Sequence, residues 1–428
     1  MALGGGVFTS QTKVLPGSYI NVVSKAQAVS NLGERGTVAL PIALTWAKTG
    51  VFTVTAEEFQ KNSIKIFGYA YAADEIAELR DLFKHAKKAL VYNLNDSGGA
   101  AAKNTYATAK CVGKRGNDLK VVVQANIDDS SLYDVSLYIG NTEVDKQTVA
   151  TAAELVENDF VTWGATELAV TAGAPLTGGT DGTSSNTSYQ NALNAFEPYN
   201  FNLLVCPPTA EETTQALFVA YTKRLREEIG VKFQTIIAGN SADYEGVVNL
   251  LSTQSNAIYW AAGALAGCAV NKSCTNMTYD GDLEIACTET QTELAGYIKS
   301  GVFAFHKVED ETRVLVDVNS LVTFTDTKGE MFAKNQVIRV ADQCANDTAK
   351  IFNDEFLGKV QNDASGRISL WNRIVTHRRE LEKMIAIDKY EVNSLIVEQG
   401  EKRDSVVVNE VLTPISAMEK LYMTIVIN

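Results

Sequence analysis

The stretch 201–241 reads as a strand, a helix and a second strand, and it constrains the fold more than any other part of the chain. The apolar run 203–206 is stopped by two prolines, which cannot donate to a strand ladder. Thr209 precedes Glu212 at the spacing of a helix-capping pair, and Gly230 supplies the left-handed residue that ends many helices. Between them an apolar stripe recurs at every fourth position, formed by Leu217, Tyr221, Leu225 and Ile229. Since a helix joining two strands favours a right-handed parallel crossover, we expect an α/β fold here.

Length and charge narrow the class of the protein. A chain of 428 residues is expected to hold roughly two to four domains. The formal net charge of −13 argues against nucleic acid or an anionic membrane as a partner. The six cysteines show no CxxC spacing, which is typical of reduced thiols in a core. The longest apolar run, 257–270, is too short for a bilayer and predicts a buried helix packed closely against a sheet. No export signal is visible, so we expect folding in a cytoplasm.

Turn residues and composition predict the domain organisation. Four strand-like segments separated by turns predict an inserted antiparallel β-sandwich or barrel-like domain; they are 106–112, 119–125, 132–139 and 142–149. A glycine-rich stretch after them has linker composition. Two amphipathic helices and three strand candidates (395–397, 406–411 and 421–427) follow towards the C-terminus.

These patterns predict a multidomain chain of α/β and α+β type with extended ends. The expected parts are an N-terminal arm at 1–22, the first part of an α/β body at 23–99, the β-domain at 100–172, a linker at 173–188, the main α/β domain at 189–330, an α+β C-terminal domain at 331–417 and a linking strand at 418–428.

A search for chemistry returns no catalytic, cofactor or metal site. The GxSxG, GxxxxGK[ST], GxGxxG and HExxH patterns are all missing from the sequence. Asp280, Asp282 and Glu284 lack the ordered ligand series of a calcium loop and are interpreted as an acidic turn. His85 is expected at a solvated helix end, and His306 on a packed or edge strand. The run 377–379 (His-Arg-Arg) is expected on a solvated helix face, because Glu380 and Glu382 follow at once.

The order of these parts resembles the tail sheath proteins of contractile bacteriophage tails and of related phage-tail-like bacteriocins, particularly those of Gram-positive bacteria. The segments that carry the resemblance are LPGSYINVVS at 15–24, ERGTVALPIALTWAKTG at 34–50, SADYEGVVNLL at 241–251, WAAGALAGCAVNKSCTNMTYDG at 260–281, FAKNQVIRVADQCAND at 332–347 and FLGKVQNDASGR at 356–367.

The resemblance implies a non-catalytic central domain of subtilisin-like α/β topology. It also implies a structural subunit that stacks as hexameric rings around a tail tube and contracts to drive that tube through a bacterial envelope. Expected partners are further copies of the chain, the tail tube protein, and baseplate and tail terminator proteins, with no cofactor, nucleic acid or membrane. The expected location is a virion tail or an extracellular phage-tail-like particle, assembled in the host cytoplasm.

The resemblance further implies that both ends link neighbouring subunits by adding strands to a partner's sheet. The residues expected to do so are Val7, Phe8, Val14, Leu15, Tyr19 and Ile20 in the N-terminal arm, and Leu421, Tyr422, Met423, Ile425, Val426 and Ile427 at the C-terminus. A frayed N-terminus and a C-terminal strand paired inside its own chain are the alternatives.

Two other classes of protein fit parts of the pattern. An α/β hydrolase with a β accessory domain would share the central strand–helix–strand unit but needs a catalytic constellation. A self-assembling surface-layer protein would share the capacity to polymerise but ordinarily carries an export signal. Helically striated cylinders, flat lattices or dispersed particles in electron micrographs would distinguish the three.

Overall fold

A computed structural model describes residues 32–46, 48–95 and 98–427. Its centre is a seven-stranded sheet in the order β13-β12-β11-β10-β1-β3-β2. Six neighbouring strands run parallel, and β2 at one edge pairs antiparallel with β3. The strands are β1 (Thr37–Ile42), β2 (Val51–Thr55), β3 (Lys88–Asn93), β10 (Leu203–Val205), β11 (Gln234–Ala238), β12 (Val247–Leu250) and β13 (Val302–Phe303).

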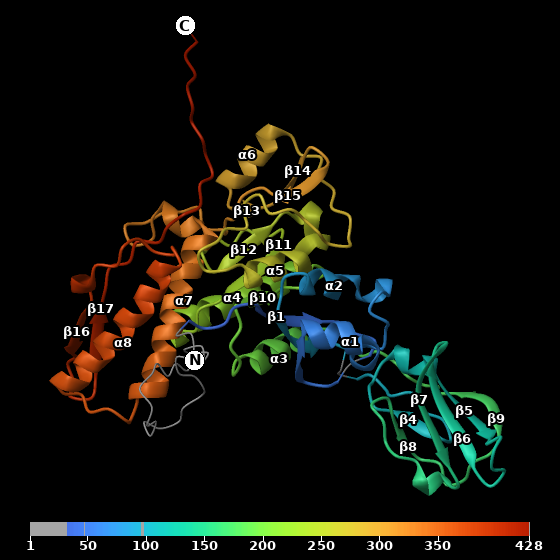
Figure 1. Ribbon diagram of the computed structural model, residues 1–428. Coiled ribbons are helices and arrows are strands. Elements are labelled where there is room, and N and C mark those ends of the chain that lie inside the picture. Colours follow the sequence, from blue (N-terminus) through green and yellow to red (C-terminus); the bar gives the residue numbers. More distant parts are fainter. Residues whose placement is uncertain (1–31, 47, 96–97, 428) are drawn as a thin grey trace, which may run out of the picture.

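Helices cover both faces of this sheet (Figure 1). Alternate strand residues point to opposite faces, so Val38 and Leu40 enter one core while Ala39 enters the other. The first core contains residues of α1 (Ala56–Phe67), α2 (Ala77–Phe83) and α5 (Ile258–Gly267). The second contains residues of α3 (Asn186–Phe196) and α4 (Glu212–Lys223).

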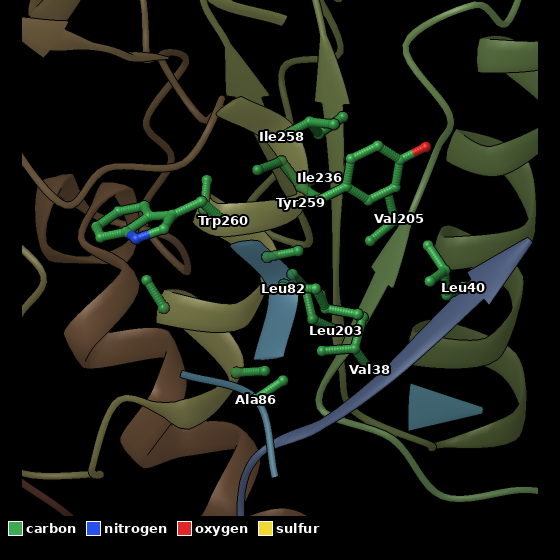
Figure 2. Packing of buried hydrophobic residues seen from close by; sticks show 14 of the residues in the cluster. Val38, Leu40, Leu82, Ala86, Leu203, Val205, Ile236, Ile258, Tyr259 and Trp260 are labelled. Carbon is green, nitrogen blue, oxygen red and sulfur yellow. The ribbon is translucent and has the colours of Figure 1, made fainter. Parts of the chain in front are cut away.

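The first core is built around α5, whose buried residues include Ile258, Tyr259 and Trp260. Figure 2 shows these side chains among those of β1, β10 and β11, with Leu82 of α2 alongside. The expectation of a helix packed closely within 257–270 agrees with this arrangement.

The strand–helix–strand prediction for 201–241 is confirmed, since β10 and β11 pair in parallel on either side of α4. Two details of the prediction are wrong. Helix α4 begins at Glu212 with Glu211 as its N-cap and no side-chain cap, so Thr209 lies too far upstream. The helix ends in a π-helical turn (Arg224–Ile229), whose wider winding takes Ile229 off the buried stripe and leaves it 57% exposed. Gly230 ends this turn in the left-handed region, with φ 91°.

The β-domain lies at one end of the molecule and has its own core (Figure 1). Its strands are β4 (Ala107–Ala109), β5 (Leu119–Ala125), β6 (Tyr133–Ile139), β7 (Thr142–Val149), β8 (Val161–Trp163) and β9 (Thr171–Pro175). Here the structure differs from the expected linker at 173–188, because β9 pairs antiparallel with β5 and Leu176 is fully buried. The five residues of β9 include two alanines and a glycine, so their pairing depends on tertiary context rather than on intrinsic strand propensity.

The C-terminal part packs two long helices against a two-stranded antiparallel sheet. Its elements are α7 (Asn335–Ile351), α8 (Ala364–Lys383), β16 (Ile396–Gln399) and β17 (Val406–Asn409). Before them come α6 (Gln291–Lys299) and the hairpin of β14 (Phe305–Val308) and β15 (Glu311–Val314). The strand expected at 421–427 is not formed within the chain, because no described segment pairs with it.

Candidate assembly interface

The C-terminal tail is held to the body as far as Glu419. The amide N–H of Ala417 donates to the Gln336 side chain at 2.9 Å. The Glu419 carboxylate accepts a hydrogen bond from the Thr275 hydroxyl at 2.9 Å and pairs with Lys334 at 2.5 Å. The path of the tail is therefore fixed by side chains of α7, of its preceding residue and of the loop that contains Thr275.

Beyond this anchor the chain is apolar and exposed. The exposed fractions are Leu421 84%, Tyr422 88%, Met423 71%, Ile425 71%, Val426 78% and Ile427 90%. Figure 1 shows this segment leading away from the body. An unpaired segment of this composition is a template for strand pairing with another chain. The alternative of internal pairing for the tail is therefore wrong among the described residues.

A second exposed apolar surface lies on the β16–β17 hairpin. Within the part of the chain that the structure describes, these two strands pair with each other alone, so each has an open edge. Ile396, Val407 and Val408 are 46%, 45% and 36% exposed. A two-stranded sheet is marginal by itself, and further strands would stabilise it.

A groove of about 590 Å³ runs beside this hairpin, between α7, α8 and β17. Its walls are mainly apolar and include Cys344, Phe352, Leu370, Ile374, Val406 and Val408. Arg378 and Glu410 supply its charged groups. We name the hairpin edge and the groove together the acceptor surface, because an open strand edge beside an apolar groove is a candidate site for receiving a strand.

A buried ionic network supports the acceptor surface, and it corrects the expectation of a solvated face at 377–379. His377 and Arg378 are 0% and 1% exposed. The Arg378 guanidinium donates to both carboxylate oxygens of Glu410, at 3.0 and 2.6 Å, and to Nδ1 of His377 at 2.6 Å. Because arginine can only donate, Nε2 of His377 carries the proton and donates to Asp347 at 2.7 Å.

Helical spacing contained a signal for this burial. His377 and Arg378 lie three and four residues after buried Ile374, and Leu381 is buried one turn further on. The two glutamates nearby suggested the wrong face. Only Arg379 of the three has the expected position, with a side chain 44% exposed and paired with Glu382.

Two further buried ion pairs fix α7 to the central domain. Asp342 accepts two hydrogen bonds from Arg226, at 2.7 and 2.9 Å. Arg339 pairs with Asp317 at 3.2 Å, and both side chains are 1% exposed. The acceptor surface therefore sits on a helix whose other side is bound to Arg226, in the turn after α4, and to Asp317, after β15, through charged groups that are costly to separate.

The remaining candidate residues have structural partners. His85 is packed rather than solvated: its ring meets Trp260 edge-on at 5.1 Å, and Nε2 lies 3.0 Å from the Asp280 carboxylate. Asp282 pairs with Arg80, so the acidic turn binds α2. His306 lies half-buried opposite Arg313. Its pKa is lowered mainly by burial and to a smaller extent by the positive charge of Arg313.

All six cysteines are free thiols. Over the described ranges no group of three or more histidine, cysteine or carboxylate side chains could hold a metal ion. No described helix is long and apolar enough to cross a membrane.

Of the two ends predicted to exchange strands, the structure describes the residues of the C-terminal one. Val7, Phe8, Val14, Leu15, Tyr19 and Ile20 lie outside the described residues. Leu421, Tyr422, Met423, Ile425, Val426 and Ile427 form one exposed segment. Sequence reasoning missed the groove and its ionic support, since both depend on residues brought together by the packing of α7 on α8.

Family models match four consecutive parts of the chain. They are described as the phage tail sheath protein central domain (residues 182–320), the phage tail sheath C-terminal domain (327–428), the phage tail sheath protein beta-sandwich domain (97–181) and the tail sheath protein Gp18 domain III N-terminal region (35–94).

Individual relatives extend over nearly the whole chain. The phage-like element PBSX protein XkdK of Bacillus subtilis (strain 168) is 30% identical over 470 residues, covering all of both proteins. The crystal structure of a sheath tail protein from Desulfitobacterium hafniense is 35% identical, with a TM-score of 0.81 over 95% of this chain and 99% of that one. The anti-feeding prophage helical sheath in its contracted state shares the fold, with a TM-score of 0.55 at 11% identity over 96% and 99%.

Proposed function

This chain belongs to the phage tail sheath protein family, and we propose that it polymerises as stacked hexameric rings around a tail tube and contracts to drive the tube through a bacterial envelope. Its partners are then neighbouring copies, the tail tube protein, and baseplate and terminator proteins. Assembly takes place in the host cytoplasm, and the product is a virion tail or a phage-tail-like particle. The fold shared with a sheath in its contracted state supports the contractile part of this proposal.

The central domain is proposed to be a non-catalytic relative of the subtilisin-like topology. Its parallel strands covered by helices on both faces support this assignment. The chain contains three histidines, and each has a structural environment: His85 between Trp260 and Asp280, His306 opposite Arg313, and His377 between Asp347 and Arg378. A general base activating a serine would need one of these rings to face that serine instead.

The observation that carries the assembly proposal is the anchored, exposed tail. Seven residues from Leu421 to Ile427 follow the Glu419 anchor and have six large apolar side chains with exposed fractions of 71% or more. We infer that this tail, together with the N-terminal arm, adds strands to a second copy. The open β16–β17 edge offers backbone partners, and the apolar groove beside it offers a place for side chains.

The free energy of one strand pairing between copies is small, and an assembly would contain many such pairings. Each cross-strand pair contributes about 0.2 to 1 kcal/mol, so a single short pairing is weak. A ring of copies linked through two neighbours forms several such pairings at once, and the links add without a large rigid interface. Backbone pairing also permits the domains to rotate while the strands stay joined.

The test removes residues 421–428 and leaves the Glu419 anchor in place. We expect a folded subunit by circular dichroism, with the same thermal transition as the full chain, and no cylinders in electron micrographs. Removal of residues 1–20 is expected to act in the same way. Cylinders of normal length from either truncation would contradict strand exchange by that end.

Point variants separate strand pairing from simple apolar contact. Ile425→Pro and Val426→Pro each remove one backbone donor, and adjacent donors point in opposite directions, so at least one variant must stop assembly. Ile425→Val is the matched control for Ile425→Pro and should assemble. Ile127→Ser, which alters a 98% exposed isoleucine of the β-domain, should also assemble. Assembly by both proline variants would exclude a backbone ladder at these positions.

A further inference from the structure

Two cysteines lie at the ends of the loop that follows α5. The backbone N–H of Cys268 donates to the carbonyl oxygen of Ala264 at 2.9 Å. The sulfur of Cys274 lies 3.7 Å from the same oxygen. For each of the two thiols, the largest influence on its pKa is a hydrogen bond with the other thiol. The turn at 268–274 therefore returns Cys274 to the last turn of α5, where its sulfur and the backbone of Cys268 contact the same carbonyl oxygen.

Two arginines border this loop. Arg35 donates from Nε to the carbonyl oxygen of Cys268 at 3.2 Å. Arg339 donates from Nη1 to the carbonyl oxygen of Lys272 at 2.8 Å. The Asp317 carboxylate opposes them, since it pairs with Arg339 and accepts the backbone N–H of Cys274 at 3.0 Å. The loop is thus held between the residues preceding β1 and the helix α7.

The pKa values of the two thiols are shifted in opposite directions in this environment. The hydrogen bond from Cys274, assisted by the charges of Arg339 and Arg35 and opposed by burial and Asp317, lowers the pKa of Cys268 to about 7. The same hydrogen bond, together with burial, raises the pKa of Cys274. A thiolate is the nucleophile in thiol–disulfide exchange, so Cys268 is the attacking sulfur and Cys274 the resolving one.

We propose that Cys268 and Cys274 are a redox-active pair that closes to an intramolecular disulfide under oxidising conditions. The Cys268 thiolate attacks a low-molecular-weight disulfide, forms a mixed disulfide and releases one thiol. Cys274 then loses its proton and attacks the Cys268 sulfur, which releases the second thiol. The protein gives up two electrons and two protons, and the small disulfide takes up both.

The other four cysteines are poorer candidates. Burial raises the pKa of Cys111 to about 11, that of Cys344 to about 12 and that of Cys206 further still. Cys287 is partly exposed, but burial also raises its pKa. Cys268 is partly exposed and is the single cysteine of the six whose pKa is lowered. Oxidation should therefore be selective for the α5 loop.

A protein that leaves a reducing cytoplasm would meet conditions in which such a disulfide persists. The bond would tie the C-terminal end of α5 to the chain segment that starts at Cys274. Arg35 and Arg339 hold the same loop, so the bond would form in a segment that contacts both the residues preceding β1 and helix α7. The inference uses the subunit's own residues and does not depend on sheath formation.

The test uses the full chain in glutathione buffers of graded ratio, followed by acid quenching, alkylation and peptide mapping by mass spectrometry. We expect a 268–274 disulfide in the oxidised buffers and four alkylated cysteines in place of six. The melting temperature should rise by a few degrees on oxidation, because the crosslink restricts the unfolded chain. Cys274→Ser should stop at a glutathione adduct on Cys268.

Cys287→Ser is the matched control, and it should oxidise at 268–274 like the wild type. The wild-type map decides the matter even where a variant fails to fold. Six free thiols in the most oxidising buffer, or an adduct on Cys287 in preference to Cys268, would overturn the proposal.

Discussion

Arg378 and Arg379 are neighbours in sequence with opposite surroundings. Arg378 is 1% exposed and bound to Glu410, Thr348 and His377, whereas the Arg379 side chain is 44% exposed with one partner, Glu382. A buried charge that loses its partner stays desolvated, while an exposed charge returns to water. Adjacent positions on α8 therefore provide an internal comparison of the two cases.

Arg378→Met should destabilise the protein by about 3 to 5 kcal/mol, because it leaves the Glu410 carboxylate with the neutral Tyr390 hydroxyl in place of its charged partner and removes the donor to Nδ1 of His377. Arg379→Met should change stability by no more than about 0.5 kcal/mol. Chemical denaturation of both variants measures the difference. Equal effects would show that the buried network contributes nothing beyond a surface pair.

The Cys268 thiol should become reactive at a lower pH than the Cys287 thiol. Its pKa is lowered to about 7 in the folded protein, so the thiolate is lost as pH falls through 7. The rate of alkylation by iodoacetamide at Cys268 should be half-maximal near pH 7, whereas Cys287, whose pKa is raised by burial, should reach its half-maximal rate only at a clearly higher pH. The lowered pKa of Cys268 contributes stability that is fully present above the pKa of the unfolded thiol and is lost as pH falls through about 7. Rates at both sites that rise together would exclude the shift.

The burial and contacts of individual side chains were the features hardest to predict from the sequence. The missing catalytic motifs were read directly from the chain, but the burial of His377 and the approach of Cys268 to Cys274 were not. Both depend on side chains from separate segments: His377 on Asp347 of another helix, and the cysteines on arginines 35 and 339. The helical spacing of His377 from Ile374 indicated burial, but the prediction gave more weight to the charged residues that follow it.

Among the elements, α5 shows how composition determines packing distance. A Cβ atom added at Gly263 would lie 2.2 Å from the carbonyl oxygen of Leu82, so the backbones of α5 and α2 meet where no side chain fits. The alanine- and glycine-rich run predicted a helix packed closely against a sheet, and the backbone approach at Gly263 is to helix α2 instead. Strand β9 gave no such signal, because a Thr-Ala-Gly-Ala-Pro segment looks the same in a linker as in a sheet.

Gly263→Ala should destabilise the fold by about 1 to 3 kcal/mol, since backbone must move to admit the methyl group. Gly296→Ala in α6 is the matched control, because nothing lies within 4 Å of its added Cβ. That change should stabilise by about 0.5 to 1 kcal/mol through helix propensity. Thermal melts of both variants test the contrast, and a neutral Gly263→Ala would mean that α5 can shift away from α2 at little cost.

At the scale of the molecule, the two chain segments that join the β-domain to the body lie side by side. The N–H of Gly182 donates to the carbonyl oxygen of Asn95 at 2.9 Å, so the two ends of the domain meet. Sequence patterns predicted a separate β-domain and most of its strands, although β8 and β9 were missed. The last strand of the domain, β9 (Thr171–Pro175), overlaps the glycine-rich stretch, so the linker expected at 173–188 began inside a strand.

Replacing residues 98–181 by a short Gly/Ser linker should leave the remainder folded, because adjacent ends cost little loop entropy. Trp46 of the body packs on Phe160 of the β-domain with a ring separation of 6.2 Å, so the excised protein should also carry Trp46→Gln. Calorimetry is expected to show one cooperative transition for the shortened chain. Loss of that transition would show that the β-domain is part of the body's core.

If the tail adds a strand to a neighbouring copy, as proposed, the anchor at Glu419 limits how far the two copies can separate while joined. A strand advances about 3.3 Å per residue, so the described residues 420–427 span about 26 Å from the anchor when fully extended. Each residue used for pairing shortens the free part by the same amount. With residues 423–427 paired, the three residues between the anchor and the paired strand span about 10 Å. A rearrangement that keeps its links intact must therefore move adjacent anchors by rotation about the joined strands rather than by large translations between them.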